Sequence, residues 1–449
     1  MARPAAGAGR QAQVARLLVV AGLGACANQG PPPGGPPDKA PPQVVRVVPE
    51  SGAVLPGFKG DAVLQFDEVI DEMPGGGARG GGGGGGRGGA GGAAPVNGLA
   101  GQIVLSPVAG DVHVSWHRSA IHVKPAEGWK PNRVYHLELL PGIVDLRRNI
   151  LKQGKTVIFS TGAPLPHAAL AGTALHWVEQ RVLAGAVIRA APLPDTVAYV
   201  TVADSAGDFH LTDIPRGRYR VWAIQDQNSN RQLDRREPFD STTVAIDSSG
   251  SAVLWVFAHD TVGPRIRSVD PVDSLACRIQ FTAPLDPRRP LDAAQVRLYA
   301  LPDTTPVAVR ALFTSAQYDS LQAKARAAAD SLRRAKDTTA HGGAPAPAAQ
   351  RAPAMAGAPR APSARDTAAV HGDTTRIRRL LKQRPVPFDR VVLQAARPLA
   401  PGTKYLIRFH GATNLNGAAA DAQGVLTVPV PKPAARDTTR APRDTTKSP

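Results

Sequence analysis

Cysteine and aromatic side chains are scarce in this chain, which has 2 cysteines in 449 residues and only 5% Phe, Trp and Tyr. Two cysteines cannot form the disulfide framework of a small secreted domain. If Cys26 is not available for a disulfide, Cys277 has no other cysteine to pair with. Its neighbours in Leu275–Ile279 predict that it is a small, buried strand residue. Apolar residues make up 43% of the chain, which suffices for the cores of about three domains.

Catalytic signatures are also missing. The sequence has no Gly-x-Ser-x-Gly, His-Glu-x-x-His, Walker or dinucleotide-binding motif. The run Gly80–Gly86 lacks the Lys-Ser/Thr and the following helix of a phosphate loop. One predicted strand ends in an acidic cluster: Asp67, Glu68, Asp71 and Glu72. A charged strand edge explains this cluster better than a catalytic carboxylate pair does. We therefore expect that the protein is not an enzyme.

The N-terminal apolar stretch, Val14–Ala25, is too short to span a bilayer but has the length of a signal-peptide core. Three arginines and no acidic residue occupy residues 1–16. The stretch ends in Leu-Gly-Ala-Cys26, which resembles a lipobox, so we predict a signal peptide over 1–25 and lipid attachment at Cys26. A buried first helix is the alternative, but the three prolines from Pro31 disfavour it. Residues 26–40, rich in Pro and Gly, would then tether the protein to the membrane.

The net charge of +17 raises the question of nucleic-acid binding. The charge is spread along the chain, however, and no helix-turn-helix, zinc finger or aromatic-studded basic strand accompanies it. A solvated, arginine-rich surface that meets anionic envelope polymers is the simpler interpretation. We expect no nucleic-acid partner.

Three low-complexity segments separate the rest of the chain: Pro74–Pro95, Ala340–Arg365 and Lys432–Pro449. The first is nearly all glycine, the second is Ala, Pro and Gly, and the third repeats Arg-Asp-Thr-Thr. Such compositions cannot pack a core, so we predict a flexible loop, an unfolded insert and a disordered tail.

Short alternating runs between these segments predict strands. Four clear cases start at Ala62, Val112, Arg133 and Thr156, with turn-forming residues between them. Many short strands with frequent turns are typical of a β-sandwich. Helical patterns are confined to Tyr318–Lys336, with Leu321, Ala325, Ala328 and Leu332 on one stripe, and Thr375–Gln383. Both lie in an insertion over 315–385, so we expect them to decorate the fold rather than define it.

The chain contains two copies of one pattern. Pro42–Pro49 matches Pro264–Pro271 in its flanking prolines and its alternation, and each copy continues into a strand with a phenylalanine. Later, Pro131–Tyr135 corresponds to Pro401–Tyr405. Two related sandwiches should therefore flank a different middle part.

Residues 41–162 resemble the bacterial Ig-like domain named after the S-layer protein SbsA. The matching features are the Pro-Pro opening, the Phe66-Asp-Glu strand, the Pro-x-x-x-Tyr135 strand, the turn Val144–Asn149 and the Phe159–Gly162 ending. The start of the mature chain also resembles envelope lipoproteins that carry this domain. The second copy is a weaker match, because a long insert interrupts it and its closing strand, Val425–Val430, lacks the Phe-Ser-Thr-Gly ending.

The middle of the chain, about 168–257, resembles a carboxypeptidase regulatory-like domain, which is a transthyretin-like sandwich. The matching residues are Leu170–Thr173, Asp204–Leu211 and Ile214–Val221. In the last of these, Gly217 permits a tight turn and Tyr219 returns to the core.

These observations predict an all-β chain of tandem Ig-like and transthyretin-like sandwiches with low-complexity insertions. The expected divisions are 1–25 signal peptide, 26–40 lipidated tether, 41–163 first Ig-like domain with an insert at 74–95, 164–260 regulatory-like sandwich, 261–430 second Ig-like domain with an insert at 315–385, and 431–449 tail.

The candidate calcium loop, Asp226–Glu237, is the one segment with site-like spacing. Its side-chain oxygens at loop positions 1, 3, 5, 9 and 12 follow the EF-hand pattern, in which position 7 gives a backbone carbonyl. The ligands would be Asp226, Asn228, Asn230, Gln232, Asp234 and Glu237. Arg231 stands where that pattern has glycine, and arginines offset the acids. A weak calcium site and a polar hairpin held by side-chain turns are the alternatives.

A histidine group, His113, His117 and His122, is the other candidate for metal binding. His113 and His117 share one face of a strand, opposite two valines and Trp116, which is the pattern of a solvated face. No cysteine or close carboxylate pair completes a ligand set, so we expect no metal there.

The function we expect is non-catalytic: an exported, membrane-anchored lipoprotein, in the outer membrane, whose sandwiches space, scaffold or bind other envelope components. The membrane would be one partner, through the lipid on Cys26, and envelope proteins or polysaccharides would be others. The alternative is a glycan- or peptide-binding surface module of an adhesion or uptake assembly.

Overall fold

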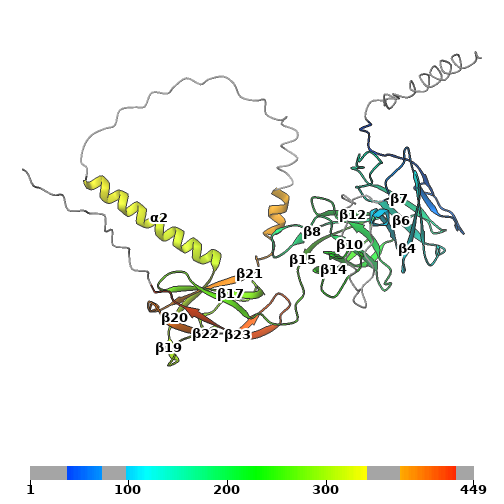
Figure 1. The fold of residues 1–449 in the computed structure, drawn as a ribbon. Coiled ribbons are helices and arrows are strands. Elements are labelled where there is room, and N and C mark those ends of the chain that lie inside the picture. The colour runs from blue at the N-terminus through cyan, green and yellow to red at the C-terminus, as the bar shows by residue number, and fades with distance from the viewer. Residues whose placement is uncertain (1–37, 73–97, 341–374, 431–449) are drawn as a thin grey trace, which may run out of the picture.

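The computed structural model describes residues 38–72, 98–340 and 375–430. The predicted signal peptide, Cys26 and nearly all of the tether, the glycine-rich insert, the low-complexity stretch after Ala340 and the tail lie outside these ranges. The predicted all-β class is confirmed, because the strands form six sheets that pack as sandwiches. Figure 1 shows the β-rich bodies following one another in chain order.

The first sandwich packs the sheet β1-β2-β5-β4 against the sheet β3-β6-β7, and all neighbouring strands are antiparallel. Alternation along β6 places Tyr135 and Leu137 in the core and His136 and Glu138 on the outer face. Its elements are β1 (Val44–Val48), β2 (Ala62–Phe66), the 3-10 turn η1 (Gly98–Gln102), β3 (Ile103–Ser106), β4 (Val112–His117), β5 (Ala120–Pro125), β6 (Val134–Leu139) and β7 (Lys155–Ser160).

The middle sandwich combines the sheet β11-β10-β13-β14 with the sheet β12-β8-β15, in which β9 also pairs with β8. One pair, β8 with β15, is parallel. Tyr219 is fully buried, as its turn predicts, and its hydroxyl donates to the Pro215 carbonyl at 2.6 Å. The strands are β8 (Ala168–His176), β9 (Arg181–Val182), β10 (Val187–Pro192), β11 (Tyr199–Val202), β12 (Asp208–Ile214), β13 (Gly217–Ile224), β14 (Phe239–Ile246) and β15 (Ser249–Val256).

The third sandwich has the sheets β16-β17-β21-β20 and β19-β18-β22-β23. Cys277 lies on β17 with none of its surface exposed, and burial raises the pKa of its thiol to about 12. It is therefore the inert core residue that its neighbours predict. The elements are β16 (Ile266–Pro271), β17 (Ala276–Leu285), η2 (Ala293–Gln295), β18 (Val296–Ala300), β19 (Thr305–Val307), β20 (Val309–Thr314), β21 (Phe388–Ala395), β22 (Lys404–Thr413) and β23 (Ala419–Thr427).

The closing strand starts earlier than its sequence indicates. The pattern predicts Val425–Val430, whereas β23 begins at Ala419 and pairs with β22 along nearly its whole length. Its first residues, Ala-Ala-Asp-Ala-Gln-Gly, have low β-propensity and are held by the hairpin partner instead.

Both predicted helices are present. The first, α2 (Ser315–Ala340), leaves β20, and Tyr318 near its start is buried against β17 and β21. Its predicted apolar stripe does not pack on the sandwich, because Leu321 and Leu332 are 48% and 65% exposed. The second occupies residues 375–381 (Figure 1, orange). Within the described residues, no helix combines the length and the apolar character needed to cross a membrane.

Candidate functional site

The candidate calcium loop connects β13 to β14, and its acidic side chains bind backbone N–H groups of the loop. The Asp226 carboxylate accepts from the N–H groups of Asn230 at 3.3 Å and Arg231 at 2.7 Å. Glu237, which is buried, accepts from the N–H of Gln227 at 2.8 Å. These are the side-chain turns that a polar hairpin requires.

The amide side chains complete this network. Asn228 and Asn230 each donate from Nδ2 to the same Asp234 oxygen, at 2.5 and 2.9 Å, and Asn230 Oδ1 accepts from the N–H of Gln232 at 2.8 Å. The acids Asp226, Asp234 and Glu237 do not form a group with oxygens within 4.8 Å of one another in the described chain. The structure thus brings all six predicted ligands into one loop, and calcium binding there stays a prediction.

Arg231, the residue at the position of the EF-hand glycine, has a backbone conformation that favours glycine, with φ at 56°. Its side chain leaves the loop and donates to the carbonyls of Gly101 and Ile103 in the first sandwich. Burial lowers the pKa of Arg231, and the carboxylates of Asp226 and Glu138 oppose that shift. The Arg231 side chain therefore joins the first and middle sandwiches.

The outer face of the β3–β6 sheet forms the rest of this first junction. The hydroxyl of Ser106 accepts from the N–H of Val200, on edge strand β11, at 2.9 Å. The neighbouring Thr201 hydroxyl donates to Glu138 at 2.9 Å. Burial raises the pKa of Glu138, and the Thr201 hydrogen bond opposes the shift. Polar side chains on this face therefore bind a second sandwich rather than water.

His136 is the most deeply buried ionisable group of the first junction. Its ring packs against Tyr199, with ring centres 5.0 Å apart, and its Nε2 lies 3.4 Å from the Asp213 carbonyl. Burial lowers the pKa of His136 to about 4, although the Asp213 carbonyl and carboxylate act in the opposite direction. The imidazole is therefore neutral at pH 7.

The second junction joins the middle and third sandwiches through the segment 375–387, which we call the strap. Arg376 pairs with Asp208 of β12. The strap's Arg384 lies over the rings of Trp177 and Trp255, at 5.5 and 5.3 Å from the ring centres. The indole of Trp177 also donates to the Pro385 carbonyl at 3.1 Å. The second predicted helix, which begins this strap, thus bridges two sandwiches and does not merely decorate the third.

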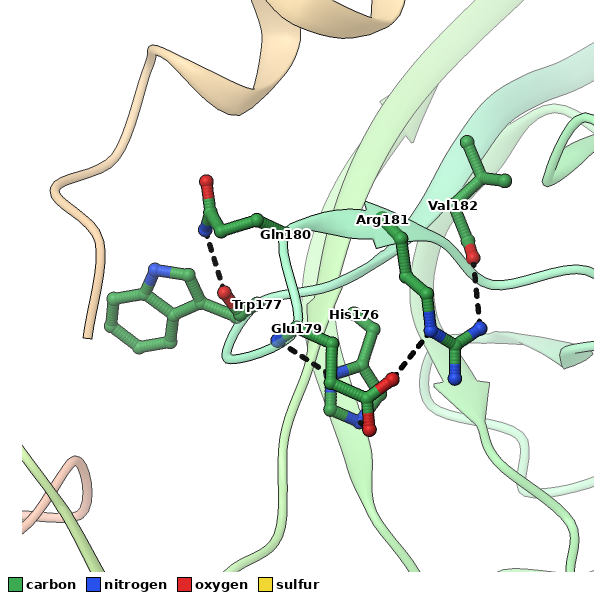
Figure 2. A network of polar contacts seen from close by, with 6 residues as sticks. All are labelled: His176, Trp177, Glu179, Gln180, Arg181 and Val182. Carbon is green, nitrogen blue, oxygen red and sulfur yellow. Dashed lines mark hydrogen bonds and ion pairs between the residues drawn. The ribbon is translucent and has the colours of Figure 1, made fainter. Parts of the chain in front are cut away.

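The turn between β8 and β9 presents Trp177 to the strap (Figure 2). His176 Nδ1 accepts from the N–H of Glu179 at 3.2 Å, and the Glu179 carboxylate contacts Arg181 at 2.5 Å. The Gln180 side chain donates to the Trp177 carbonyl at 2.6 Å. This network fixes the turn and so holds the Trp177 indole at the junction.

An acidic group lies where the first sandwich receives its incoming chain. In the described ranges, Asp38, Glu68 and Asp145 are the one group of three Asp, Glu, His or Cys residues whose potential ligand atoms all lie within 4.8 Å of one another. Burial raises the pKa of Glu68, and the neighbouring carboxylates of Asp145 and Asp38 raise it further. Among the four acids that the sequence clusters, Glu68 alone belongs to this set.

Asp145 has a structural role that accounts for its burial. Its carboxylate accepts from the N–H groups of Arg147 and Asn149, both at 2.8 Å, which closes the turn after β6. In the third sandwich Asn414 closes the equivalent turn and donates to the Asp260 carbonyl of the incoming chain at 2.7 Å. Asp145 and Asn414 also form equivalent β-bridges, Asp145 with Ile70 and Asn414 with Leu285.

The predicted solvated histidine face is present. His113 and His117 are exposed on β4, and the opposite face of this strand packs on the first core. The rings of His117 and His122 lie 4.6 Å apart, and His122 contacts Asp61 at 3.5 Å. The three histidines belong to no metal-competent group in the described residues.

Comparison with known proteins finds no matching family model and no matching curated protein. Among solved structures, the major pilin subunit of Bacillus cereus matches with a TM-score of 0.17 at 11% identity, over 49% of this chain and 71% of the pilin. Alpha-2-macroglobulin from Escherichia coli matches with a TM-score of 0.17 at 11% identity, over 59% and 84%. The surface layer protein SbsC matches with a TM-score of 0.16 at 8% identity, over 94% and 57%. Similarities of this degree assign the chain to no family.

Proposed function

We propose that the protein is a non-catalytic envelope lipoprotein in which three sandwiches form a rigid spacer that holds other envelope components at a distance from the membrane. The observation that carries this proposal is that side-chain contacts occupy both junctions. Arg231 crosses the first junction, and Arg384 rests on two tryptophans at the second. Domains joined only by linkers move freely, whereas buried polar and aromatic contacts restrict such motion.

Small-angle X-ray scattering of the full-length chain tests this rigidity. We expect one narrow distribution of intramolecular distances at low and high salt. The double variant Arg231→Gly/Arg384→Gln, which cuts both junctions, should broaden this distribution. Arg235→Gly/Arg297→Gln changes two exposed arginines and is the matched control. A broad distribution for the unaltered chain would contradict the spacer function.

Attachment to the membrane through Cys26 is the second part of the proposal. The sequence ending at Cys26 resembles the lipobox of bacterial lipoproteins, which supports lipid attachment at this residue. A single acyl chain would anchor the protein to the membrane only marginally. Cys26→Ser should release the protein into the soluble fraction or leave its precursor uncleaved. Cys277→Ala is the control, because that thiol is buried on β17, and it should remain with the membrane. Normal cleavage and unchanged membrane retention of Cys26→Ser would refute the anchor.

We further propose that the partners are envelope proteins or polysaccharides and that the lipid anchor lies in the outer membrane. Cross-linking and pull-down from solubilised envelope would identify them. An exposed aromatic platform would favour a glycan-binding module, and in the described part of the chain every Phe, Trp and Tyr is buried or half-buried. The described residues thus lack the surface that would favour the glycan-binding alternative.

A further inference from the structure

A cavity of about 330 Å³ lies within the first junction, beside the contacts of Arg231. Its walls come from β3, β4 and the loop between them on one side, and from β10, β11 and the candidate calcium loop on the other. The volume is at the lower end of the range of small-molecule pockets, about 300–1,000 Å³. Neither sandwich alone contains this space.

Arg189 and Arg231 are the two cations of the cavity lining, and only Arg231 has described carboxylates nearby. Arg189 lies on β10 between Ile188 and Ala190, which both belong to the middle core, so alternation directs Arg189 outward, toward the junction. Its Nη1 donates to the Arg231 carbonyl at 2.8 Å. Burial lowers the pKa of Arg189. A cation removed from water in this way usually has a carboxylate partner.

That partner is missing from the described chain. Arg189 forms no ion pair with any described carboxylate, whereas Arg231 has Asp226 and Glu138 nearby. Asp111 is the one acidic residue of the cavity lining, and it is exposed to solvent. Among the described residues, the Arg189 guanidinium therefore has no carboxylate as an ion-pair partner.

The remaining walls are partly aliphatic and partly polar. Val104, Val108, Val200 and Ala198 give aliphatic surface, and Ser106, Asn230 and Gln232 give polar surface. An inorganic anion would leave the valines without a partner, whereas an alkyl chain would be removed from water against them. The complementary ligand has a carboxylate for Arg189 and a short aliphatic chain for the valines.

We propose that this cavity binds a small aliphatic monocarboxylate, with its carboxylate on the Arg189 guanidinium. The ligand contacts both sandwiches, so its binding also stabilises the first junction. This site goes beyond the spacer function, which requires no ligand.

Isothermal titration calorimetry of the full-length chain with hexanoate tests the site, with hexanamide and inorganic phosphate as comparison probes. Hexanoate should bind, and the other two probes should bind at least tenfold more weakly. Hexanamide lacks the carboxylate for Arg189, and phosphate lacks the aliphatic chain for the valines. Arg189→Met should weaken hexanoate binding about 10- to 100-fold, as expected for loss of a charged hydrogen bond. Arg189→Lys, which keeps the charge, should lose less.

The matched control is Arg220→Met, which removes an exposed arginine from the same face of the same sheet. It should bind hexanoate like the unaltered chain. If Arg189→Met fails to fold by circular dichroism, Ala198→Leu tests the proposal independently, because the added side chain fills the cavity and should abolish binding. Equal hexanoate affinity in the unaltered chain, Arg189→Met and Ala198→Leu would overturn the proposal. So would the absence of hexanoate binding at millimolar concentration, or equally tight binding of phosphate.

Discussion

Tyr135 and Tyr405 make the same hydrogen bond in two different sandwiches. Each phenolic oxygen accepts the backbone N–H of the residue five positions earlier, Lys130 or Ala400, at 2.8 Å. Each tyrosine also lies near the start of a central strand, β6 or β22, with its ring in the core. The first and third sandwiches thus share a local device as well as a sheet arrangement.

Tyr135→Phe and Tyr405→Phe should each destabilise one sandwich and leave the other unchanged. Each removes the partner of a partly buried N–H, which costs about 1–2 kcal/mol of unfolding free energy. Native-state hydrogen exchange resolves the two sandwiches separately. Tyr299→Phe is the control, since that ring lies beside Arg408 at the surface of β18, and it should change stability by less than about 0.5 kcal/mol. Equal losses in both sandwiches from either tyrosine variant would show that they do not unfold independently.

Acid should weaken the first junction through His136. The pKa of His136 is about 4 in the folded protein and near 6.5 in the unfolded chain. Below pH 6.5 the unfolded chain therefore takes up a proton that the folded protein does not. Stability that is fully present above pH 6.5 is lost as the pH falls toward 4, by about 3 kcal/mol at most.

Urea unfolding of the full-length chain at a series of pH values measures this loss. His136→Leu should flatten the stability profile between pH 6.5 and 4. His113→Leu, which changes an exposed histidine of β4, should leave the profile as it is. The explanation fails if His136→Leu and the unaltered chain have parallel profiles.

Arg231→Gly should separate the first and middle sandwiches while leaving the loop backbone intact. Glycine accepts the positive φ of this position without strain, so the effect reports the side chain. The carbonyls of Gly101 and Ile103 lose their donors, at a cost of about 1–3 kcal/mol. Faster hydrogen exchange in β3 and β11 would record the separation. Arg235→Gly, in the same loop but exposed, should not change exchange there.

Calcium should stabilise the middle sandwich only weakly. The three arginines inside the candidate calcium loop favour a weak affinity of about 10⁻⁴–10⁻³ M, as in extracellular modules. At a calcium concentration ten times Kd, the free energy of unfolding should rise by about 1.4 kcal/mol. Thermal unfolding with millimolar calcium or with chelator measures it, and Asp226→Ala should remove the difference. Superimposed melting curves for the unaltered chain would identify the loop as a polar hairpin without metal.

The strand pattern predicts the fold class because burial of one face imposes a period of two residues. Tyr135, Cys277 and Tyr219 lie in cores as their neighbours indicate. The same period cannot distinguish a face in water from a face under another sandwich. His136 and Glu138 alternate with core residues just as His113 and His117 do, yet one pair is covered by β11 and its neighbours and the other is solvated.

The spacing of polar residues in the candidate calcium loop predicts local structure but not the contacts of the loop with another sandwich. The oxygen-bearing side chains predict a compact, internally bonded loop, and the structure contains one. Arg231 at the glycine position counts against the EF-hand pattern, but the sequence does not indicate its second role at the junction. Its partners, two carbonyls about 130 residues earlier, could not be identified without the fold.

The strap gives the middle and third sandwiches two points of attachment. Asn414 donates a hydrogen bond to the Asp260 carbonyl in the covalent linker after β15. Arg384 of the strap packs over Trp177 and Trp255. A single linker acts as a swivel, about which one body can both bend and twist. A second attachment removes most of that torsional freedom, so a pull at the far end of the third sandwich is transmitted as tension along the molecule instead of being dissipated in rotation.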